Sequence, residues 1–471
     1  MAETTYHEAT AHEATALPVM LPGKLVGRDK TLAAVYAELK QNKAVLLYGG
    51  PGVGKTAIAA TLASAYTQQP GGALWLSTDA DTLSALIVRV GRSFGDMDIA
   101  NSDNPTGMVG AAATLLAQHK PLVVLDGNPM MPAAREFINK LAPNLPVMIV
   151  TGARADGPWA QVEVPPLADD DATTLFTEKS GIATPEAGQI AAELDQNALA
   201  LLVAAGTARI AKLEAPALIS ALQNSPEDSA PRKALNVGFA SLQPALQGIL
   251  LMLGATFEGK ASLEMVTRLS GAATDTVEKV MNILSASGFV QKDMRYGAPF
   301  YYLHPTAHAY AESFLASSGR LKPLRDKVRD TVLAYANDHS SANAHDKLSV
   351  EMDAFLATAH WASEQGESDV SSQIVVSLTQ AGDFVKGRGY LSELLQLQDS
   401  GSSGTSAFPA NATLPPEATP LPGIDEDDDD PFADTEAFEE NTLAAPEDIV
   451  PPTPSLDESD PDSLRIGVME A

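Results

Sequence analysis

The chain has 471 residues, of which 45% are hydrophobic, no cysteine and a formal net charge of −29. This length predicts about three compact domains, and the absence of cysteine excludes disulfide bonds and thiolate metal sites. No apolar run reaches the ~18 residues of a membrane span, and the N-terminus lacks the basic-then-apolar order of a signal peptide. We therefore expect a cytoplasmic protein without a membrane segment. The negative charge also disfavours nonspecific binding to nucleic acid.

Ordered structure is expected to begin near residue 21, after a disordered leader over residues 1–20. Within residues 21–40, Leu32, Val35, Tyr36 and Leu39 recur at helical spacing. This spacing predicts a helix that packs one apolar face on a sheet.

The next segment combines an apolar run at 44–48, a glycine-rich loop and an alanine-rich stretch that predicts a helix to about Tyr66. The loop reads G-x-x-x-x-G-K-T, in the strand–loop–helix context that a phosphate-binding loop requires. Glycines let backbone N–H groups surround phosphate oxygens, and the helix N-terminus adds its positive dipole end. Lys55 is expected to neutralise the terminal phosphates of ATP or ADP, and the Thr56 hydroxyl to ligate Mg²⁺. The predicted phosphate-loop residues are Gly49, Gly50, Pro51, Gly52, Val53, Gly54, Lys55, Thr56 and Ala57.

Apolar runs at 72–77 and 122–125 predict two more strands of a parallel sheet with crossover helices. Asp126 follows the second run, at the sheet edge where such folds bind ligands, and we expect it to hold Mg²⁺. Gly127 stands where a fast ATPase usually has a second acid, so the attacking water would lack one positioned group. We therefore predict slow hydrolysis, with Lys55 and Asp126 as the catalytic residues.

A further strand is predicted within residues 147–154, and Arg154 lies just beyond its apolar part. Arginine at this place either reaches a terminal phosphate with two N–H groups or is a solvated loop residue. We favour the phosphate role.

Residues 233–318 predict a winged helix, because three short amphipathic segments precede two strands around a Tyr-Gly turn. Such a domain can read DNA. However, Lys260, Arg268 and Lys279 are balanced by nearby acids, so no basic recognition face emerges.

Residues 323–398 are predicted to be helical throughout, with small and aromatic residues at helical spacing. Only one or two helix pairs fit, whereas repeat arrays need about three units, so a plain helical cap is the alternative. Residues 401–471 follow with 18 acidic residues and a single arginine. This Pro-rich tail is predicted to be disordered. A solvating role is the ordinary explanation for such a tail, and a segment that binds a protein partner is the alternative.

The order and spacing of several motifs resemble the NB-ARC branch of the STAND signalling ATPases over roughly residues 20–400. These motifs are LVGRD (25–29), GGPGVGKT (49–56), LVVLDG (122–127), VTGAR (150–154), VPPLADDDATTLF (164–176), QNALAL (196–201) and LHPTAHAYAE (303–312). The resemblance implies that Val26, Gly27, Arg28 and Arg154 lie at the nucleotide and that His304 contacts its β-phosphate. Four positions depart from the family pattern. Ala198 replaces a proline, Pro305 replaces an acid, Arg154 lies one residue further along than the family's arginine, and Gly127 stands where relatives have Asp or Asn.

The resulting prediction is an α/β P-loop NTPase core over 21–167 and an all-α subdomain over 168–232. A winged helix over 233–318, a TPR-like helical region over 319–400 and the acidic tail over 401–471 would follow. We expect a switch in which ATP or ADP with Mg²⁺ controls domain arrangement, and protein partners or homo-oligomers bind through the helical region or the tail. The alternatives are an AAA+-like ATPase or transcriptional regulator whose winged helix binds DNA, and a P-loop scaffold that does not hydrolyse ATP.

Overall fold

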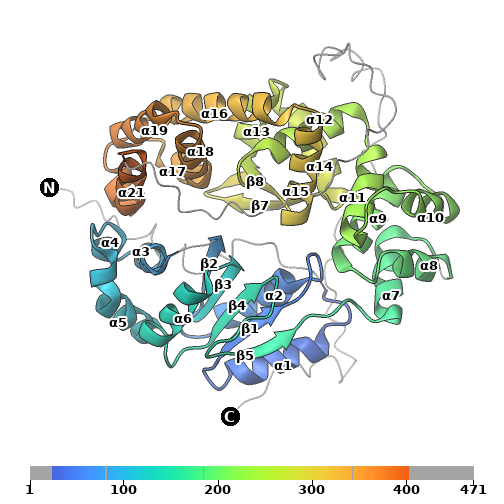
Figure 1. Ribbon diagram of the computed structural model, residues 1–471, viewed down its shortest axis with the longest axis horizontal. Coiled ribbons are helices and arrows are strands. Elements are labelled where there is room, and N and C mark those ends of the chain that lie inside the picture. Colours follow the sequence, from blue (N-terminus) through green and yellow to red (C-terminus); the bar gives the residue numbers. More distant parts are fainter. Residues whose placement is uncertain (1–23, 80–81, 184, 342, 403–471) are drawn as a thin grey trace, which may run out of the picture. The chain divides into compact units, whose positions relative to one another are not determined.

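The computed structural model describes residues 24–79, 82–183, 185–341 and 343–402, and the predictions for residues 1–20 and 403–471 lie outside it. Its first domain is built on a five-stranded sheet (Figure 1), in which every pair of neighbouring strands is parallel. The strands are β1 (Ala44–Tyr48), β2 (Ala73–Asp79), β3 (Leu122–Asn128), β4 (Val147–Thr151) and β5 (Ala160–Glu163). The spatial order is β2-β3-β4-β1-β5, so β4 separates β1 from β3.

Four of these strands lie at the predicted apolar runs, but the sequence did not predict β5. The reason is physical: β5 is an edge strand that pairs only with β1, and its residues are half-buried or exposed. Its sequence AQVE therefore carries no apolar run that could identify it. The predicted strand over 147–154 is shorter than expected, because β4 ends at Thr151.

Alternate residues of each strand point to opposite faces, and each face has its own apolar core. In β1, Leu46 packs into the core formed with α3 (Leu83–Ser93), α5 (Val109–His119) and α6 (Met131–Lys140). Its neighbours Val45 and Leu47 pack against α1 (Asp29–Leu39) and α2 (Lys55–Thr67). The sheet is thus covered by helices on both faces, which explains why its strands read as continuous apolar runs.

Five helices follow the sheet: α7 (Asp169–Ser180), α8 (Glu186–Glu193), α9 (Ala198–Ile210), α10 (Ala215–Gln223) and α11 (Ala230–Ala240). Helix α9 is the central one, because it contacts α7, α10, α11 and α14 (Thr274–Ala286). Almost every residue of α9 from Leu199 to Ala208 is buried. A helix that is apolar all round is typical of the centre of a helical bundle.

Residues 244–303 form the helix-and-hairpin unit that the sequence indicated, with one additional strand. Helices α12 (Pro244–Ala255), α13 (Leu263–Ser270) and α14 surround an antiparallel sheet of order β6-β8-β7. The strands are β6 (Lys260–Ser262), β7 (Val290–Arg295) and β8 (Ala298–Leu303), of which the three-residue β6 was not predicted. Tyr296 and Gly297 join β7 to β8 with positive φ at both residues, as a two-residue hairpin loop requires.

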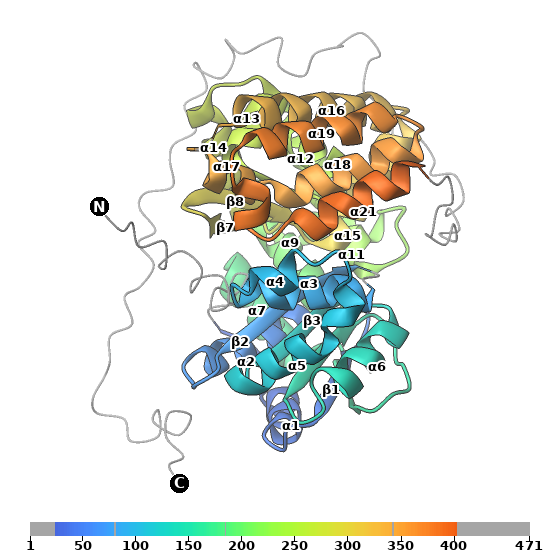
Figure 2. The same cartoon turned by 90° about the vertical axis from the view of Figure 1, so that its left-hand side faces the viewer.

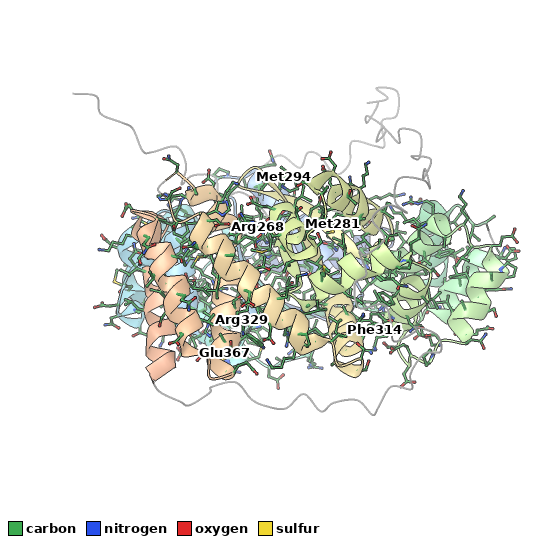
Figure 3. All side chains as sticks on the ribbon, turned by 90° about the horizontal axis from the view of Figure 1, so that it is seen from above. Arg268, Met281, Met294, Phe314, Arg329 and Glu367 are labelled. Carbon is green, nitrogen blue, oxygen red and sulfur yellow. The ribbon has the colours of Figure 1, made fainter. Side chains whose placement is uncertain are left out.

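From residue 305 on, all the described secondary-structure elements are helices, as predicted for 323–398. They are α15 (Pro305–Ser317), α16 (Leu321–Asp338), α17 (His345–Val350), α18 (Met352–Glu364), α19 (Ser368–Gln380), α20 (Phe384–Gly387) and α21 (Leu391–Ser402). Figure 2 shows α18, α19 and α21 side by side, and these three helices contact one another. Arg329 of α16 pairs with Glu367, just before α19, at 2.7 Å (Figure 3).

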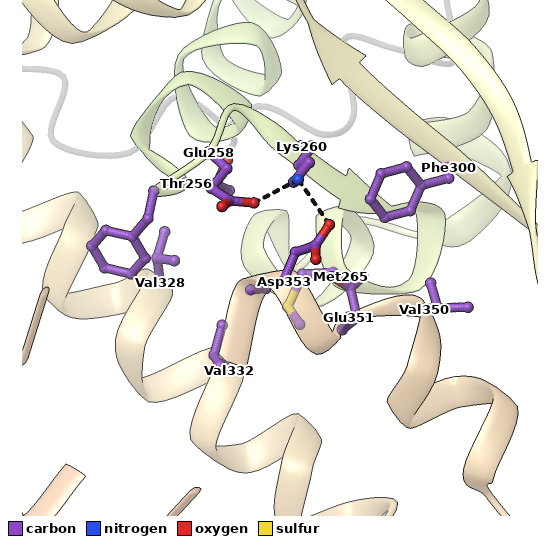
Figure 4. Close-up of a pocket in the computed structure, with 12 residues that line it drawn as sticks. Thr256, Glu258, Lys260, Met265, Phe300, Val328, Val332, Val350, Glu351 and Asp353 are labelled. Carbon is purple, nitrogen blue, oxygen red and sulfur yellow. Dashed lines mark ion pairs between the residues drawn. The ribbon is translucent and has the colours of Figure 1, made fainter. Parts of the chain in front are cut away.

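A charged cluster joins β6 to the C-terminal helices (Figure 4). Lys260 pairs with Glu258 at 2.6 Å and with Asp353 at 2.8 Å. Glu351 is 1% exposed, and its carboxylate accepts a hydrogen bond from the backbone N–H of Ser262 at 2.8 Å. The cavity beside the cluster holds only about 10 Å³, room for about one water molecule.

The P-loop domain also contacts the last helices through Arg92 of α3. This side chain forms an ion pair with Glu393 of α21, and its Nε and Nη2 donate to the Gly389 carbonyl at 3.3 and 3.2 Å. Nearby, the amide of Asn101 donates to the Lys386 carbonyl at 2.9 Å. These polar interactions therefore join segments that lie almost 300 residues apart in the sequence.

Among the described residues, no helix has both the length and the apolar character that crossing a membrane requires.

A glycine in α9 allows close packing against the hairpin unit and provides a test of this packing. A Cβ at position 206 would lie 2.4 Å from the carbonyl oxygen of Ser287, which is backbone and has little freedom to move. We expect Gly206→Ala to destabilise the protein by about 1–3 kcal/mol, as overpacking does. Gly188→Ala in α8 is the matched control, because its Cβ would meet only the Thr173 hydroxyl at 3.6 Å. Urea unfolding measures both, and equal stability of the two variants would contradict the close packing.

Candidate functional site

The glycine-rich segment forms the loop between β1 and α2. Gly54 precedes α2 with φ of 99°, and no side chain caps the first turn of this helix. The first N–H groups of α2 therefore remain available to a ligand, and they favour an anion. Gly49 fits against the next segment so closely that a Cβ there would lie 2.5 Å from the carbonyl oxygen of Val164. These positions explain why glycine is needed at both ends of the loop.

Lys55 lies over the loop, where its Nζ donates to the carbonyls of Gly49 and Gly50 at 3.0 and 2.9 Å. Burial lowers the pKa of Lys55, and the nearby charge of Asp126 partly opposes this shift. A cation already held at the mouth of a phosphate loop can neutralise terminal phosphates.

Thr56 lies in the first turn of α2, and Asp126 lies in β3. The two residues meet although β4 separates β1, the strand before the loop, from β3, and the Thr56 hydroxyl donates to Asp126 Oδ1 at 3.2 Å. A hydroxyl and a carboxylate are oxygen ligands of the kind that Mg²⁺ prefers. These residues would hold the ion, which would supply charge neutralisation at the phosphates when bound.

Gly127 has φ of 127°, a backbone conformation that side-chain-bearing residues rarely adopt. An acid at this position would be strained, so the structure gives a physical reason for the glycine that the sequence showed after Asp126. Within β3, the chain is therefore shaped to present one carboxylate, not two adjacent ones.

Arg28 supports the loop from behind and is 4% exposed. Its guanidinium donates to the carbonyl of Val53 at 2.7 Å and to that of Pro165 at 2.9 Å. Burial lowers the pKa of Arg28, and the charge of Asp171 partly opposes this. Arg28 thus joins the phosphate loop to the segment that leads into α7. Val26 and Gly27, the other two predicted site residues of this segment, lie in the turn before Arg28. Gly27 packs against the side chain of Asp171.

Asn197 contacts the opposite side of the loop and was not among the predicted site residues. Its amide donates to the Pro51 carbonyl at 2.9 Å, and the N–H of Leu199 donates to the Gly52 carbonyl at 2.9 Å. The signal in the sequence was the asparagine directly before an apolar helical run, which is typical of a helix N-cap. That signal locates a helix start but does not reveal which loop the side chain touches.

His304 precedes α15, and its ring is held in one tautomer. The N–H of Thr306 donates to His304 Nδ1 at 3.1 Å, so Nδ1 carries no proton and the neutral ring has its N–H at Nε2. Burial lowers the pKa of His304 to about 4, and the charge of Lys55 contributes to this shift. His304 therefore lies within electrostatic reach of the phosphate loop, as a neutral hydrogen-bond donor.

Arg154 is exposed in the loop beyond β4, and among the described residues it makes no hydrogen bond or ion pair. The structure thus brings Arg28, Lys55, Thr56, Asp126 and His304 to the loop region, whereas Arg154 is not held there by a contact. Its phosphate role stays a prediction.

The double contact of Arg28 makes a specific prediction. Lysine offers a point charge without the planar fork, so Arg28→Lys should lose one of the two carbonyl contacts and lower the free energy of unfolding by about 1–3 kcal/mol. Arg135→Lys is the control, because Arg135 is exposed and donates to one backbone carbonyl, that of Asp156. Urea unfolding of the variants and the wild type measures the difference, and equal losses at the two positions would contradict a supporting role for Arg28.

The lowered pKa of His304 predicts a pH dependence of stability. Because the folded pKa of about 4 lies below the ordinary 6.5, the unfolded chain binds the proton more readily. The contribution of His304 to the free energy of unfolding is fully present above pH ~6.5 and decreases as the pH falls towards 4. At pH 5 the free energy of unfolding should be lower by about 2 kcal/mol than above pH ~6.5. His304→Asn keeps an N-cap acceptor but does not titrate, so its unfolding free energy should change less between pH 7.5 and 5. Identical pH profiles for the two proteins would show that the ring is not buried beside Lys55.

The match to one protein-family model agrees with the P-loop geometry. Residues 24–240 match the model of the AAA ATPase domain. Among solved structures, the chain is similar to a Signal Transduction ATPase with Numerous Domains (STAND) protein with a tetratricopeptide repeat sensor from Pyrococcus horikoshii. The TM-score is 0.48 at 15% identity, covering 84% of this chain and 60% of that chain. A Walker-type ATPase of Pyrococcus abyssi has a TM-score of 0.31 at 12% identity, covering 64% of this chain and 99% of that chain.

Both structural likenesses are too weak to assign a function, and the chain spans only 60% of the length of the first protein. No curated protein matches. The matched domain, the parallel sheet and the phosphate loop together establish that this part of the chain is a P-loop NTPase domain.

Proposed function

We propose that the protein is a nucleotide-dependent switch that binds ATP or ADP with Mg²⁺ and hydrolyses ATP slowly. The observation that carries this proposal is the set of contacts around the phosphate loop. Lys55, Thr56 and Asp126 of the P-loop domain meet there, and Asn197 at the start of α9 is hydrogen-bonded to the loop. The charge of Lys55 also acts on His304 at the start of α15. A ligand in the loop would therefore lie beside groups from more than one segment of the chain.

Lys55 and His304 are the residues through which bound phosphate would favour one domain arrangement. Lys55 neutralises the terminal phosphates, and the His304 Nε2–H would donate to the β-phosphate, as the resemblance to NB-ARC proteins implies. A donor that remains neutral binds phosphate without bringing a second buried charge beside Lys55. The domain arrangement with His304 at the loop would then be favoured by ADP, and the contacts of Arg92 with Glu393 and Gly389 would belong to the same closed arrangement.

Slow turnover follows from the same site. Asp126 provides one carboxylate for the metal, while Gly127 offers no side chain to position the attacking water. Val26, Gly27 and Arg28 would shape the nucleotide site from the N-terminal side. The helical region over 319–400 and the tail over 401–471 are the proposed surfaces for protein partners or for a second copy of the chain.

A winged helix over 233–318 is part of this proposal, but DNA binding is not. The basic side chain of Arg268 in α13 is engaged with Glu264 at 3.0 Å and with Asp338 at 2.7 Å. Lys292 of β7 donates to Asn282 at 3.3 Å. A recognition helix needs its cations free to meet phosphates and base edges, so the contacts within the protein favour an internal role.

Nucleotide binding and turnover of three variants test the proposal. Lys55→Ala should abolish measurable binding of a fluorescent ADP, whereas Lys43→Ala, which removes an exposed lysine paired with Glu38, should bind like the wild type. Asp126→Asn should lose the Mg²⁺-dependent part of ATP binding. The wild type should hydrolyse ATP far below the ~10 per second of a typical enzyme. Fast multiple turnover would contradict the switch, and unchanged binding by Lys55→Ala would contradict the site.

A further inference from the structure

Asn197 makes two different hydrogen bonds with the two ends of its side-chain amide. Its Oδ1 accepts from the N–H of Ala200 at 3.1 Å and so caps α9, while its Nδ2 donates to the Pro51 carbonyl at 2.9 Å. The residue is 7% exposed, so water competes little for either bond. One side chain therefore joins the start of α9 to the phosphate loop.

The contact involves two successive peptide units of the loop. The carbonyls of Pro51 and Gly52 accept from Asn197 and from the N–H of Leu199, respectively. Each carbonyl shares a planar peptide unit with the next N–H group, that of Gly52 or Val53. In phosphate loops such N–H groups surround the phosphates. In each of these peptide units, the carbonyl can accept a hydrogen bond from the start of α9 while the N–H donates to phosphate. Each hydrogen bond polarises the peptide unit and so strengthens the other hydrogen bond.

The fit on the α9 side is close. A Cβ on Gly52 would lie 2.7 Å from Asn197 Oδ1 and 2.8 Å from the Cβ of Leu199, and Gly52 has φ of 75°. The loop therefore cannot change its backbone at Gly52 without disturbing the start of α9.

The other half of α9 is equally close to the turn before β7. Gly206 lies against the backbone of Ser287, and Arg209 donates to the Ala286 carbonyl at 2.9 Å. Between these contacts and Asn197, the 13-residue helix α9 spans about 20 Å. The first half of α9 contacts the backbone of the phosphate loop, and its second half contacts the backbone of the turn before β7. A shift of the loop must therefore either bend α9 or move this turn.

We propose that Asn197 is a positioning residue that couples phosphate in the loop to the position of α9, and through α9 to the turn at 286–289. This inference rests on the proposed nucleotide function and names the residue that would connect it to the hairpin unit. The coupling is reciprocal, so the Asn197 contact should also slow the release of nucleotide.

The test uses the full chain and two substitutions that preserve the cap. Asn197→Ser retains an oxygen that can cap α9 but lacks the amide donor to Pro51. Asn197→Asp also retains an oxygen that can cap α9, but it replaces the amide donor with a carboxylate oxygen that faces the Pro51 carbonyl. Ser262→Ala is the matched control, because Ser262 caps α13 by accepting from Met265 N at 3.1 Å, and it is similarly buried. The control reports what the loss of a buried N-cap does by itself.

Two measurements are made with fluorescent ADP and Mg²⁺. Asn197→Ser should release ADP about 3–10 times faster than the wild type, the effect of one lost hydrogen bond, and Asn197→Asp at least as fast. At saturating ADP, hydrogen exchange of the amides at 286–290 should slow in the wild type and in Ser262→Ala, but not in either Asn197 variant. The exchange result separates coupling from a purely local effect on the loop.

The outcomes distinguish this inference from the proposed function. If the wild type binds ADP, but the Asn197 variants release it at the wild-type rate and show the same protection at 286–290, the inference is wrong and the proposed function stands. An equal effect of Ser262→Ala would also refute it, because general destabilisation would then explain the result. Failure of the wild type to bind ADP refutes both.

Discussion

The backbone conformation of the phosphate loop is the constraint on which the rest of the site depends. Between β1 and α2, the loop has little apolar packing of its own, and Val53 is its buried hydrophobic side chain. Its carbonyls are instead held by hydrogen bonds from Arg28, Lys55, Asn197 and the N–H of Leu199. A chain whose carbonyls face protein donors can turn its N–H groups towards an anion. The loop is therefore organised by polar contacts from segments that lie before it and far after it in the sequence.

We base on this organisation the proposal that the binding site controls domain arrangement. The contacts on the loop come from two structural units, because Arg28 and Lys55 belong to the P-loop domain, whereas Asn197 and Leu199 lie at the start of α9. Phosphate binding would therefore be coupled to the positions of both units. His304 adds a neutral donor whose protonation is opposed by burial and by Lys55. Gly127 has a backbone conformation that is unfavourable for a second acid. The slow turnover that we propose for this site would suit a switch better than a motor.

The sequence predicted the P-loop domain well because its signals are local. The apolar runs of β1 to β4 are buried on both faces, and the loop motif needs glycine for backbone reasons that hold wherever it occurs. The edge strand β5 and the short β6 were missed because each is stabilised by pairing with a neighbour, not by an apolar run of its own. The sequence also did not reveal the order of the strands, so it did not show that Thr56 of α2 and Asp126 of β3 meet. Asn197 was missed for a related reason: its role depends on a contact with a residue 146 positions away.

The nucleotide that remains bound to the purified protein provides the most direct test of the central claim. After rapid purification in Mg²⁺, the protein is denatured and the released nucleotide is separated and quantified by chromatography. If the protein is a switch that releases nucleotide slowly, it should yield close to one adenine nucleotide per chain, mostly ADP. Dialysis against excess ATP should then replace the bound nucleotide only slowly. A protein that carries no nucleotide and gains none after incubation with ATP and Mg²⁺ would contradict the account.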